Sequence, residues 1–125
     1  MNHATLPDWL MPTWRALQAR RDRLPHALLL AGASGSGKRV FAEHLGRALL
    51  CRQPDPQGFA CGDCDDCRWL ASDNHPDLLR VVPAADQEAA QDEQDASDAS
   101  GKKEKARSSQ ILIDQVRALQ SALEL

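Results

Sequence analysis

The first apolar pattern in the chain predicts an amphipathic helix. Within residues 8–23, three large apolar residues recur at positions i, i+4 and i+7, namely Leu10, Trp14 and Leu17. This spacing places their side chains on one face of an α-helix, while polar and charged residues occupy the rest of the segment. Pro12 suits the first turn of this helix, because a proline there loses no internal hydrogen bond.

A short run without polar residues follows and predicts a buried strand. Residues 27–31, Ala-Leu-Leu-Leu-Ala, stand between Pro25 and Gly32. A run of this length, bounded by turn residues, is typical of a strand that is covered on both faces, as in a parallel sheet flanked by helices. Residues 78–82, which end before Pro83, are a second candidate strand.

The segment after the glycines has the periodicity of another helix. Within residues 40–50, Phe41, Leu45 and Leu49 follow one stripe of a helical surface. We expect this helix to pack its stripe against the first strand. Strand, loop and helix in this order predict the α/β class, with a parallel sheet flanked by helices.

A last helix is predicted at residues 111–125. Val116, Leu119 and Leu123 share one of its faces, and Asp114 has the side chain of a typical N-cap residue. Two strands and this helix cannot complete a doubly wound sheet. We therefore expect the chain to be an incomplete fragment, the N-terminal part of a longer protein.

One stretch of the sequence lacks the residues that build a core. Residues 84–109 contain no Val, Ile, Leu, Met or aromatic residue, and their charge changes from acidic to basic along the stretch. Ordering such a segment costs about 1 to 2 kcal/mol of backbone entropy per residue, without apolar burial to offset it. We expect a disordered acidic insertion in a surface loop.

Composition limits the class of protein. The 125 residues carry 15 Lys+Arg and 18 Asp+Glu, a net charge of -3, which gives no overall electrostatic footprint for nucleic acid. No apolar run approaches the roughly 20 residues that cross a bilayer, and the N-terminus lacks the order of a secretory signal. The length allows one small domain and not two, and we expect the chain to be soluble and cytoplasmic, without a membrane partner.

A phosphate-binding motif lies between the first predicted strand and the helix after it. Residues 32–39, Gly-Ala-Ser-Gly-Ser-Gly-Lys-Arg, match the P-loop pattern G-x-x-x-x-G-K. Gly32, Gly35 and Gly37 let the backbone wrap with its N–H groups pointing inward, and the helix presents its positive N-terminal end to a phosphate. Lys38 would then reach the outer phosphates.

The residue after this lysine departs from the motif's chemistry. A nucleotidase needs Ser or Thr at that position, because the hydroxyl ligates the magnesium ion that bridges the outer phosphates. This chain has Arg39, which cannot ligate a cation and places a positive charge near the metal's position. We expect the loop to bind ATP or ADP weakly or not at all, and not to hydrolyse ATP efficiently.

All four cysteines lie within residues 51–67 and predict a metal site. Cys51 ends the predicted helix, Cys61 and Cys64 flank a tight turn, and Cys67 follows on the next turn. Four thiolates without a nearby histidine suit a closed, tetrahedral, structural zinc site. Such a site would fold a loop that has almost no apolar content of its own.

Three other uses of the cysteines fit the motif less well. Disulfides are disfavoured in a cytosolic chain. A ferredoxin-type iron–sulfur motif requires, after Cys67, a further cysteine that is followed by proline. This chain has Arg-Trp-Leu-Ala at residues 68–71 instead. A thioredoxin-like redox pair at Cys61 and Cys64 would leave Cys51 and Cys67 without a role.

Taken together, these motifs resemble the AAA+ clamp-loader subunits of bacterial DNA polymerase III. The similar features are residues 26–32, the P-loop, the four-cysteine module directly after the P-loop helix, the Asn-His-Pro-Asp sequence at 74–77, and residues 111–117. Within that family, the resemblance is greatest to the delta prime subunits. The catalytic gamma/tau subunits share the zinc module but have Thr where this chain has Arg39.

The resemblance implies a function for the whole chain, residues 1–125, as the N-terminal part of an AAA+ P-loop domain. Delta prime subunits act as a non-hydrolysing stator that helps to load the beta sliding clamp onto primed DNA. The implied partners are the gamma/tau and delta subunits, the beta clamp, and primer-template DNA through the complex. Polymerase activity belongs to the holoenzyme, and no catalytic residue is expected in this chain.

Two other functions remain open from the sequence. An active, gamma/tau-like P-loop ATPase would show magnesium-dependent nucleotide binding and turnover. A zinc-ribbon module that binds nucleic acid would show salt-dependent affinity for DNA, with the P-loop serving only as structure.

Overall fold

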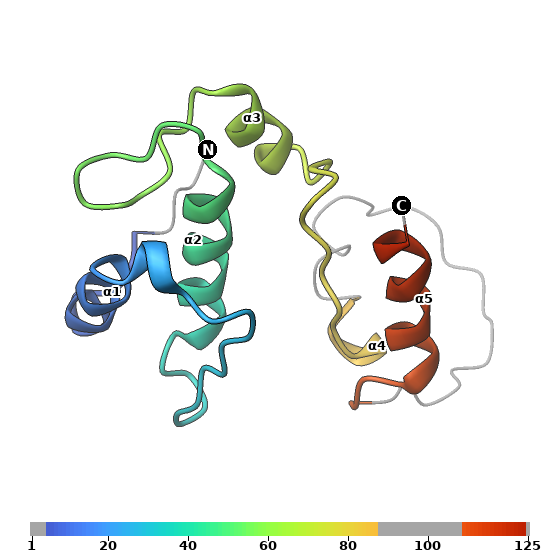
Figure 1. Cartoon of the computed structure of the whole chain (residues 1–125). Helices are drawn as coiled ribbons and strands as arrows, with labels where there is room; N and C mark the ends of the chain where they lie inside the picture. The colour runs from blue at the N-terminus through green and yellow to red at the C-terminus, as the bar shows by residue number, and fades with distance from the viewer. Residues whose placement is uncertain (1–4, 88–108, 125) are drawn as a thin grey trace, which may run out of the picture. The chain divides into compact units, whose positions relative to one another are not determined.

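The computed structural model describes residues 5–87 and 109–124, which belong to two compact units, Met1–Leu78 and Leu79–Leu125. All regular structure in these described ranges is helical (Figure 1). The first unit contains the short 3-10 helices η1 (Asp8–Leu10) and η2 (Arg21–Arg23) and the α-helices α1 (Met11–Gln18), α2 (Lys38–Leu50) and α3 (Asp65–Ala71). The second unit contains α4 (Ala84–Gln87) and α5 (Ile113–Leu123).

The predicted N-terminal helix is present as a series of short helical pieces. Pro12 lies in the first turn of α1, as its sequence position suggested. Trp14 is buried, and Leu10 and Leu17 pack partly buried against the same core, so the predicted apolar stripe is confirmed. Beyond α1 the backbone at Arg20, with φ -111° and ψ 17°, leaves the helical geometry, which ends the continuous helix earlier than predicted.

Trp14 is the centre of the core of the first unit. Its side chain is 0% exposed, its ring stacks on Phe59 with 4.5 Å between centroids, and it meets the Phe41 ring edge-on at 5.7 Å. The indole Nε1–H donates a hydrogen bond to the carbonyl of Gln57 at 2.9 Å. This one side chain therefore joins α1, α2 and the loop that leads to the cysteines.

Helix α2 packs through a stripe that differs by one residue from the prediction. Phe41 and Leu45 are buried, as expected, whereas Leu49 is 45% exposed and Ala48 is fully buried. At about 100° per residue, Ala48 lies only about 20° around the helix from Phe41, while Leu49 lies about 80° away. The assignment of Leu49 to the core stripe was therefore wrong.

The two predicted strands, residues 27–31 and 78–82, are not formed in the described part of the chain, so the expected parallel sheet is not seen there. A strand needs a neighbouring strand to pair its backbone N–H and C=O groups. Leu28 and Leu29 are 43% and 92% exposed, and of this run Leu30 is the residue that packs against the core.

The second unit has α5 as its main element. Leu112 is the N-cap residue and its N–H donates to Gln115 Oε1 at 2.9 Å, while Gln115 Nε2–H donates to the Val82 carbonyl at 2.8 Å. Asp114 lies in the first turn instead, where its charge still suits the helix dipole, so its prediction as N-cap was wrong. Val116 is 53% exposed.

The acidic stretch at 84–109 lies mostly outside the described residues. Its first four residues form α4, and residue 109 is described, whereas residues 88–108 are not.

No helix within residues 5–87 and 109–124 has both the length and the apolar character that crossing a membrane requires.

Candidate metal centre and glycine-rich loop

The four cysteines converge at one end of α2. Cys51 is the C-cap residue of α2, Cys64 is the N-cap residue of α3, and Cys67 lies in the first turn of α3. All four sulfur atoms lie within 4.8 Å of one another, with 4.0 Å between Cys51 and Cys64 and 3.9 Å between Cys61 and Cys67. No pair forms a disulfide, so the cluster can hold a metal ion.

Local backbone geometry places these sulfurs. Gly62 has φ 83°, a left-handed conformation that glycine adopts without strain, and it turns the chain between Cys61 and Cys64. The Cys61 N–H donates to the Cys51 sulfur at 3.3 Å, and the Cys67 N–H donates to the Cys64 sulfur at 3.4 Å. The turn and the start of α3 thus aim backbone donors at the cluster.

These donors shift the pKa values of the thiols in different directions. Backbone hydrogen bonds from Arg52 and then Cys67 lower the pKa of Cys64 to about 6. Hydrogen bonds from the backbone of Asp63 and Cys64 also lower the pKa of Cys61. Burial has the opposite effect on Cys67 and raises its pKa to about 12. The cluster therefore favours the thiolate form at its more exposed cysteines, and a bound cation would favour it at Cys67 as well.

Asp66 connects the cysteine loop to the turn that follows α3. Its Oδ2 pairs with Arg52 Nε at 2.5 Å, and its Oδ1 lies 3.2 Å from His75 Nε2. Burial acts to raise the pKa of Asp66, but the hydrogen bonds from Arg52 and His75 outweigh it and hold the pKa below its usual range. Since the backbone of Arg52 donates to the Cys64 sulfur, Asp66 supports the position of Cys64 indirectly.

The tautomer of His75 follows from its two partners. The backbone N–H of Asp77 donates to His75 Nδ1 at 3.1 Å, so this nitrogen is the acceptor and Nε2 carries the hydrogen that reaches Asp66. The His75 side chain is buried, and its ring meets Trp69 edge-on at 6.0 Å. The His-Pro-Asp sequence is therefore a structural part of the cysteine module.

Loss of the Asp66 carboxylate is expected to weaken metal binding by the cysteines. In Asp66→Ala, Arg52 and His75 both lose their partner, and outer-shell changes of this kind lower metal affinity about 10- to 100-fold. Asp63→Ala removes an exposed carboxylate of the same loop and serves as the matched control. Competition with a colorimetric zinc chelator measures both, and equal affinities of the two variants would contradict the role given to Asp66.

Two glycines of the glycine-rich loop adopt left-handed backbone conformations. Gly35 and Gly37 have φ 77° and 91°, values that L side chains rarely adopt, and α2 begins directly after Gly37. Lys38 Nζ donates to the carbonyls of Gly32 at 2.6 Å and Ala33 at 3.0 Å. The lysine therefore holds the two ends of the loop together, and the exposed Arg39 follows it.

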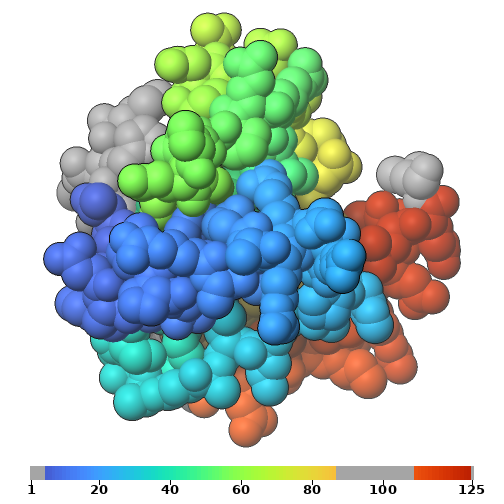
Figure 2. Space-filling model, turned by 60° about the vertical axis from the view of Figure 1, so that its left-hand side comes forward, coloured from blue at the N-terminus to red at the C-terminus, as the bar shows by residue number. Residues whose placement is uncertain are grey.

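The N-terminal segment lies against this loop. Trp9 Nε1–H donates to the Ser36 carbonyl at 3.1 Å, and a Cβ at Gly37 would come within 3.0 Å of the Leu10 side chain and 3.8 Å of Pro7. In Figure 2 the blue N-terminal segment forms a band between the green cysteine loop and the glycine-rich loop. A glycine is therefore needed at position 37 for two reasons: its φ of 91° disfavours any side chain, and a Cβ would crowd Leu10.

The described part of the chain thus has a glycine-rich loop of P-loop spacing at the start of α2 and, at the end of α2, a four-cysteine cluster that could hold a metal ion. The family described as DNA polymerase III, delta subunit matches residues 13–125. Because this match covers most of the sequence and its relatives include delta' subunits, the chain belongs to the delta prime subunit family of DNA polymerase III.

Individual relatives agree with this assignment. The DNA polymerase III subunit delta' of Pseudomonas aeruginosa is 41% identical over 80 residues, covering 64% of this chain and 24% of the relative. The delta' subunit of Escherichia coli is 37% identical over 78 residues, covering 60% and 23%. The gamma/tau subunit of Mycoplasma pneumoniae is 31% identical over 65 residues, covering 52% and 9%.

The chain spans about a quarter of the length of the curated delta' relatives that it matches. No solved structure gives a significant match to it.

Sequence reasoning placed the four cysteines correctly beside one another but missed the residues that support them. Arg52 and Asp66 stand next to or between the cysteines, and nothing in their spacing shows that they pair. The available signal was that Arg52 and Asp66 are each adjacent to a predicted cysteine ligand and carry opposite charges, because such neighbours often support metal ligands. His75, nine residues after Asp66, gave no comparable signal.

Proposed function

We propose that this chain is the P-loop part of a clamp-loader subunit that acts as a stator and does not hydrolyse ATP. In this role it helps to load the beta sliding clamp onto primed DNA, with the gamma/tau and delta subunits as partners and DNA contacted through the complex. The observation that carries the proposal is Arg39, which stands where an active P-loop has its metal-ligating hydroxyl.

The loop geometry supports weak nucleotide binding at most. Lys38, which would neutralise the outer phosphates, is engaged with the carbonyls of Gly32 and Ala33, and a nucleotide would have to displace these contacts. The neighbouring Arg39 offers charge and hydrogen-bond donors but no oxygen for magnesium. The loop thus suits a phosphate better than a magnesium–nucleotide complex. Its candidate binding residues are Gly32, Gly35, Gly37, Lys38 and Arg39.

We further propose that the four-cysteine cluster holds a structural Zn²⁺. Four sulfurs that each lie about 2.3 Å from zinc are about 3.8 Å apart in a regular tetrahedron. The observed 3.9 and 4.0 Å separations are close to that value. With Cys51, Cys61, Cys64 and Cys67 all bound, no position stays open for a substrate, so the ion would stabilise the module and perform no chemistry.

The apolar run at 27–31 fits the same proposal. The matched stretch is 24% of the length of the Pseudomonas aeruginosa delta' relative, and the exposed Leu28 and Leu29 suit an inner strand of a sheet. We propose that this run and residues 78–82 become parallel strands where partner strands are available, which gives the α/β fold of an AAA+ domain.

The chain is expected to show no magnesium-dependent ATP turnover above that of a Lys38→Ala variant, because the metal ligand is replaced by Arg39. Phosphate release from the zinc-loaded chain, with and without Mg²⁺, measures this. An Arg39→Thr variant supplies the missing hydroxyl and tests whether that residue alone limits magnesium binding.

The alternative to the stator is an active ATPase, and the similarity to gamma/tau subunits is the observation that favours it. Two gamma/tau relatives are 31% identical over about half of the chain, and this similarity supports a common origin of the two loops. Magnesium-dependent turnover by the unaltered chain that disappears in Lys38→Ala would establish this alternative in place of the stator.

A further inference from the structure

The cysteine cluster has two partly exposed and two buried members. Cys61 and Cys64 are half-buried, whereas Cys51 and Cys67 are each 6% exposed. The sulfur atoms of Cys61 and Cys67 lie 3.9 Å apart, and those of Cys51 and Cys64 lie 4.0 Å apart. Each partly exposed thiol therefore has a buried thiol beside it.

The chain leaves room for these two pairs to close. A disulfide has an S–S length of about 2.05 Å, so the sulfurs of each pair would have to approach by about 2 Å. Cys61 directly precedes the turn at Gly62, where an added Cβ would meet no atom within 4 Å. This open space lets the turn that carries Cys61 shift without a clash.

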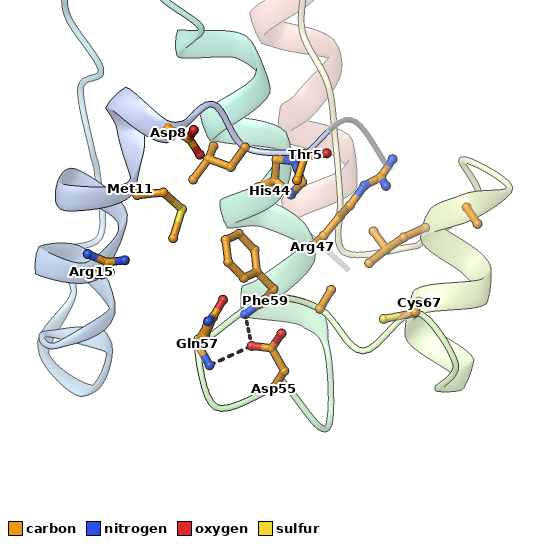
Figure 3. A pocket seen from close by; sticks show the side chains of 15 residues that line it. Thr5, Asp8, Met11, Arg15, His44, Arg47, Asp55, Gln57, Phe59 and Cys67 are labelled. Atoms are coloured by element: carbon orange, nitrogen blue, oxygen red, sulfur yellow. Dashed lines mark hydrogen bonds between the residues drawn. The ribbon is translucent and has the colours of Figure 1, made fainter. Parts of the chain in front are cut away.

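Small molecules can reach the buried side of the cluster as well. Cys67 and Gly62 are among the residues that line a cavity of about 580 Å³, and Figure 3 shows Cys67 in its wall. A water molecule occupies about 30 Å³ in the liquid, so the cavity has ample room for a molecule as small as hydrogen peroxide. Packing therefore does not keep such an oxidant away from the cysteines.

We propose that the four cysteines form a redox switch, in which a hydroperoxide converts them to the disulfides Cys61–Cys67 and Cys51–Cys64 and releases the bound metal ion. The switch rests on the structural Zn²⁺ proposed above. Cysteines bound to zinc are thiolates, and the thiolate is the form of cysteine that acts as a nucleophile toward an oxidant.

Each disulfide forms in two steps and consumes one molecule of hydroperoxide. The partly exposed thiolate attacks the O–O bond, which gives a sulfenic acid and a hydroxide or alkoxide that takes up a proton. The buried thiolate then attacks the sulfenic sulfur, so the S–S bond forms and the S–O bond breaks, with the oxygen leaving as water. The two sulfurs lose two electrons, which the peroxide accepts, and zinc loses two ligands without changing its oxidation state.

The change is reversible. A dithiol reductant opens each disulfide by thiol–disulfide exchange and is itself oxidised to a disulfide. The four thiolates can then bind zinc again.

Zinc release from the full chain provides the first test. Metal analysis establishes that the chain holds zinc, and a chromogenic chelator, at a concentration that removes no zinc by itself, then follows the addition of hydrogen peroxide. We expect loss of nearly all the zinc, and its recovery after dithiothreitol and Zn²⁺ are added. A chain that never holds zinc overturns the zinc proposal and the switch with it, whereas a chain that keeps its zinc in peroxide overturns the switch alone.

Peptide mapping under non-reducing conditions gives the pairing. Trypsin and Asp-N protease together cut between all neighbouring cysteines, because Arg or Asp residues separate them in the sequence. We expect Cys61–Cys67 and Cys51–Cys64 in the folded chain. A chain oxidised in guanidinium serves as the control, and should favour pairs of neighbouring cysteines, which close the shortest loops.

Met11→Leu is the matched control variant, because peroxide also oxidises methionine and Met11 lines the same cavity. Leucine has a similar volume, so this variant should release zinc as the unaltered chain does. The switch is overturned if zinc leaves without a disulfide, if the folded chain pairs its cysteines as the unfolded chain does, or if Met11→Leu abolishes the release.

Discussion

Removing the metal ion that we propose for the four-cysteine cluster is expected to unfold residues 51–67. The described part of this segment has Phe59 as its large apolar side chain before α3, so apolar burial alone gives its loops little stability. Structural zinc in small domains contributes about 10–16 kcal/mol of apparent binding free energy at pH 7. That is as large as the whole stability of an ordinary domain, about 5–15 kcal/mol.

A chelator and a ligand variant provide two routes to the same state. Metal analysis should find one zinc per chain in the unaltered protein, and circular dichroism should show a large loss of structure when a strong chelator is added. Returning zinc should restore the structure of the unaltered chain but not of Cys67→Ser, which has lost a buried ligand. A chelated chain that melts at the same temperature as the zinc-loaded chain would contradict a structural role for the metal.

Trp14→Ala is expected to destabilise the first unit by about 3–5 kcal/mol, the usual cost of removing a large buried aromatic side chain. Trp14 is 0% exposed and supplies the stack on Phe59, the edge contact with Phe41 and the hydrogen bond to Gln57. A loss of this size is comparable to the total stability of a small domain, so much of the variant should be unfolded without denaturant.

Trp9→Ala is the matched control. Trp9 is 69% exposed and makes one hydrogen bond, to the Ser36 carbonyl, so its removal should cost about 1 kcal/mol or less. Urea unfolding followed by far-UV circular dichroism compares the two without relying on tryptophan fluorescence. Equal destabilisation by the two substitutions would show that the core is not centred on Trp14.

Some of these features could be predicted from the sequence because they depend on local spacing. The stripe of Leu10, Trp14 and Leu17 follows helical periodicity, and the core confirms it. The four cysteines converge because a tight turn and two helix ends lie at short separations along the chain. Local rules reach this far because the residues involved are neighbours in sequence.

Other features depend on contacts that spacing does not contain. Residues 27–31 have a strand's composition, but a strand also requires a pairing partner, and the described residues provide none. Ala48 and not Leu49 is in the core because Ala48 lies about 20° around α2 from Phe41 and Leu49 about 80°. Hydrophobicity alone favours the larger Leu49. The pairing of Asp66 with Arg52 and His75 joins three segments and could not be read from any one of them.

Recovery of the native complex tests the central claim most directly. An affinity tag at the N-terminus of the chromosomally encoded protein that contains this chain, followed by mild cross-linking and mass spectrometry, identifies what it assembles with. The stator proposal predicts that the gamma/tau and delta subunits are recovered with the tagged protein and are absent from an untagged strain. Recovery of neither subunit, from cells in which the tagged protein is intact and abundant, would contradict membership of the clamp loader.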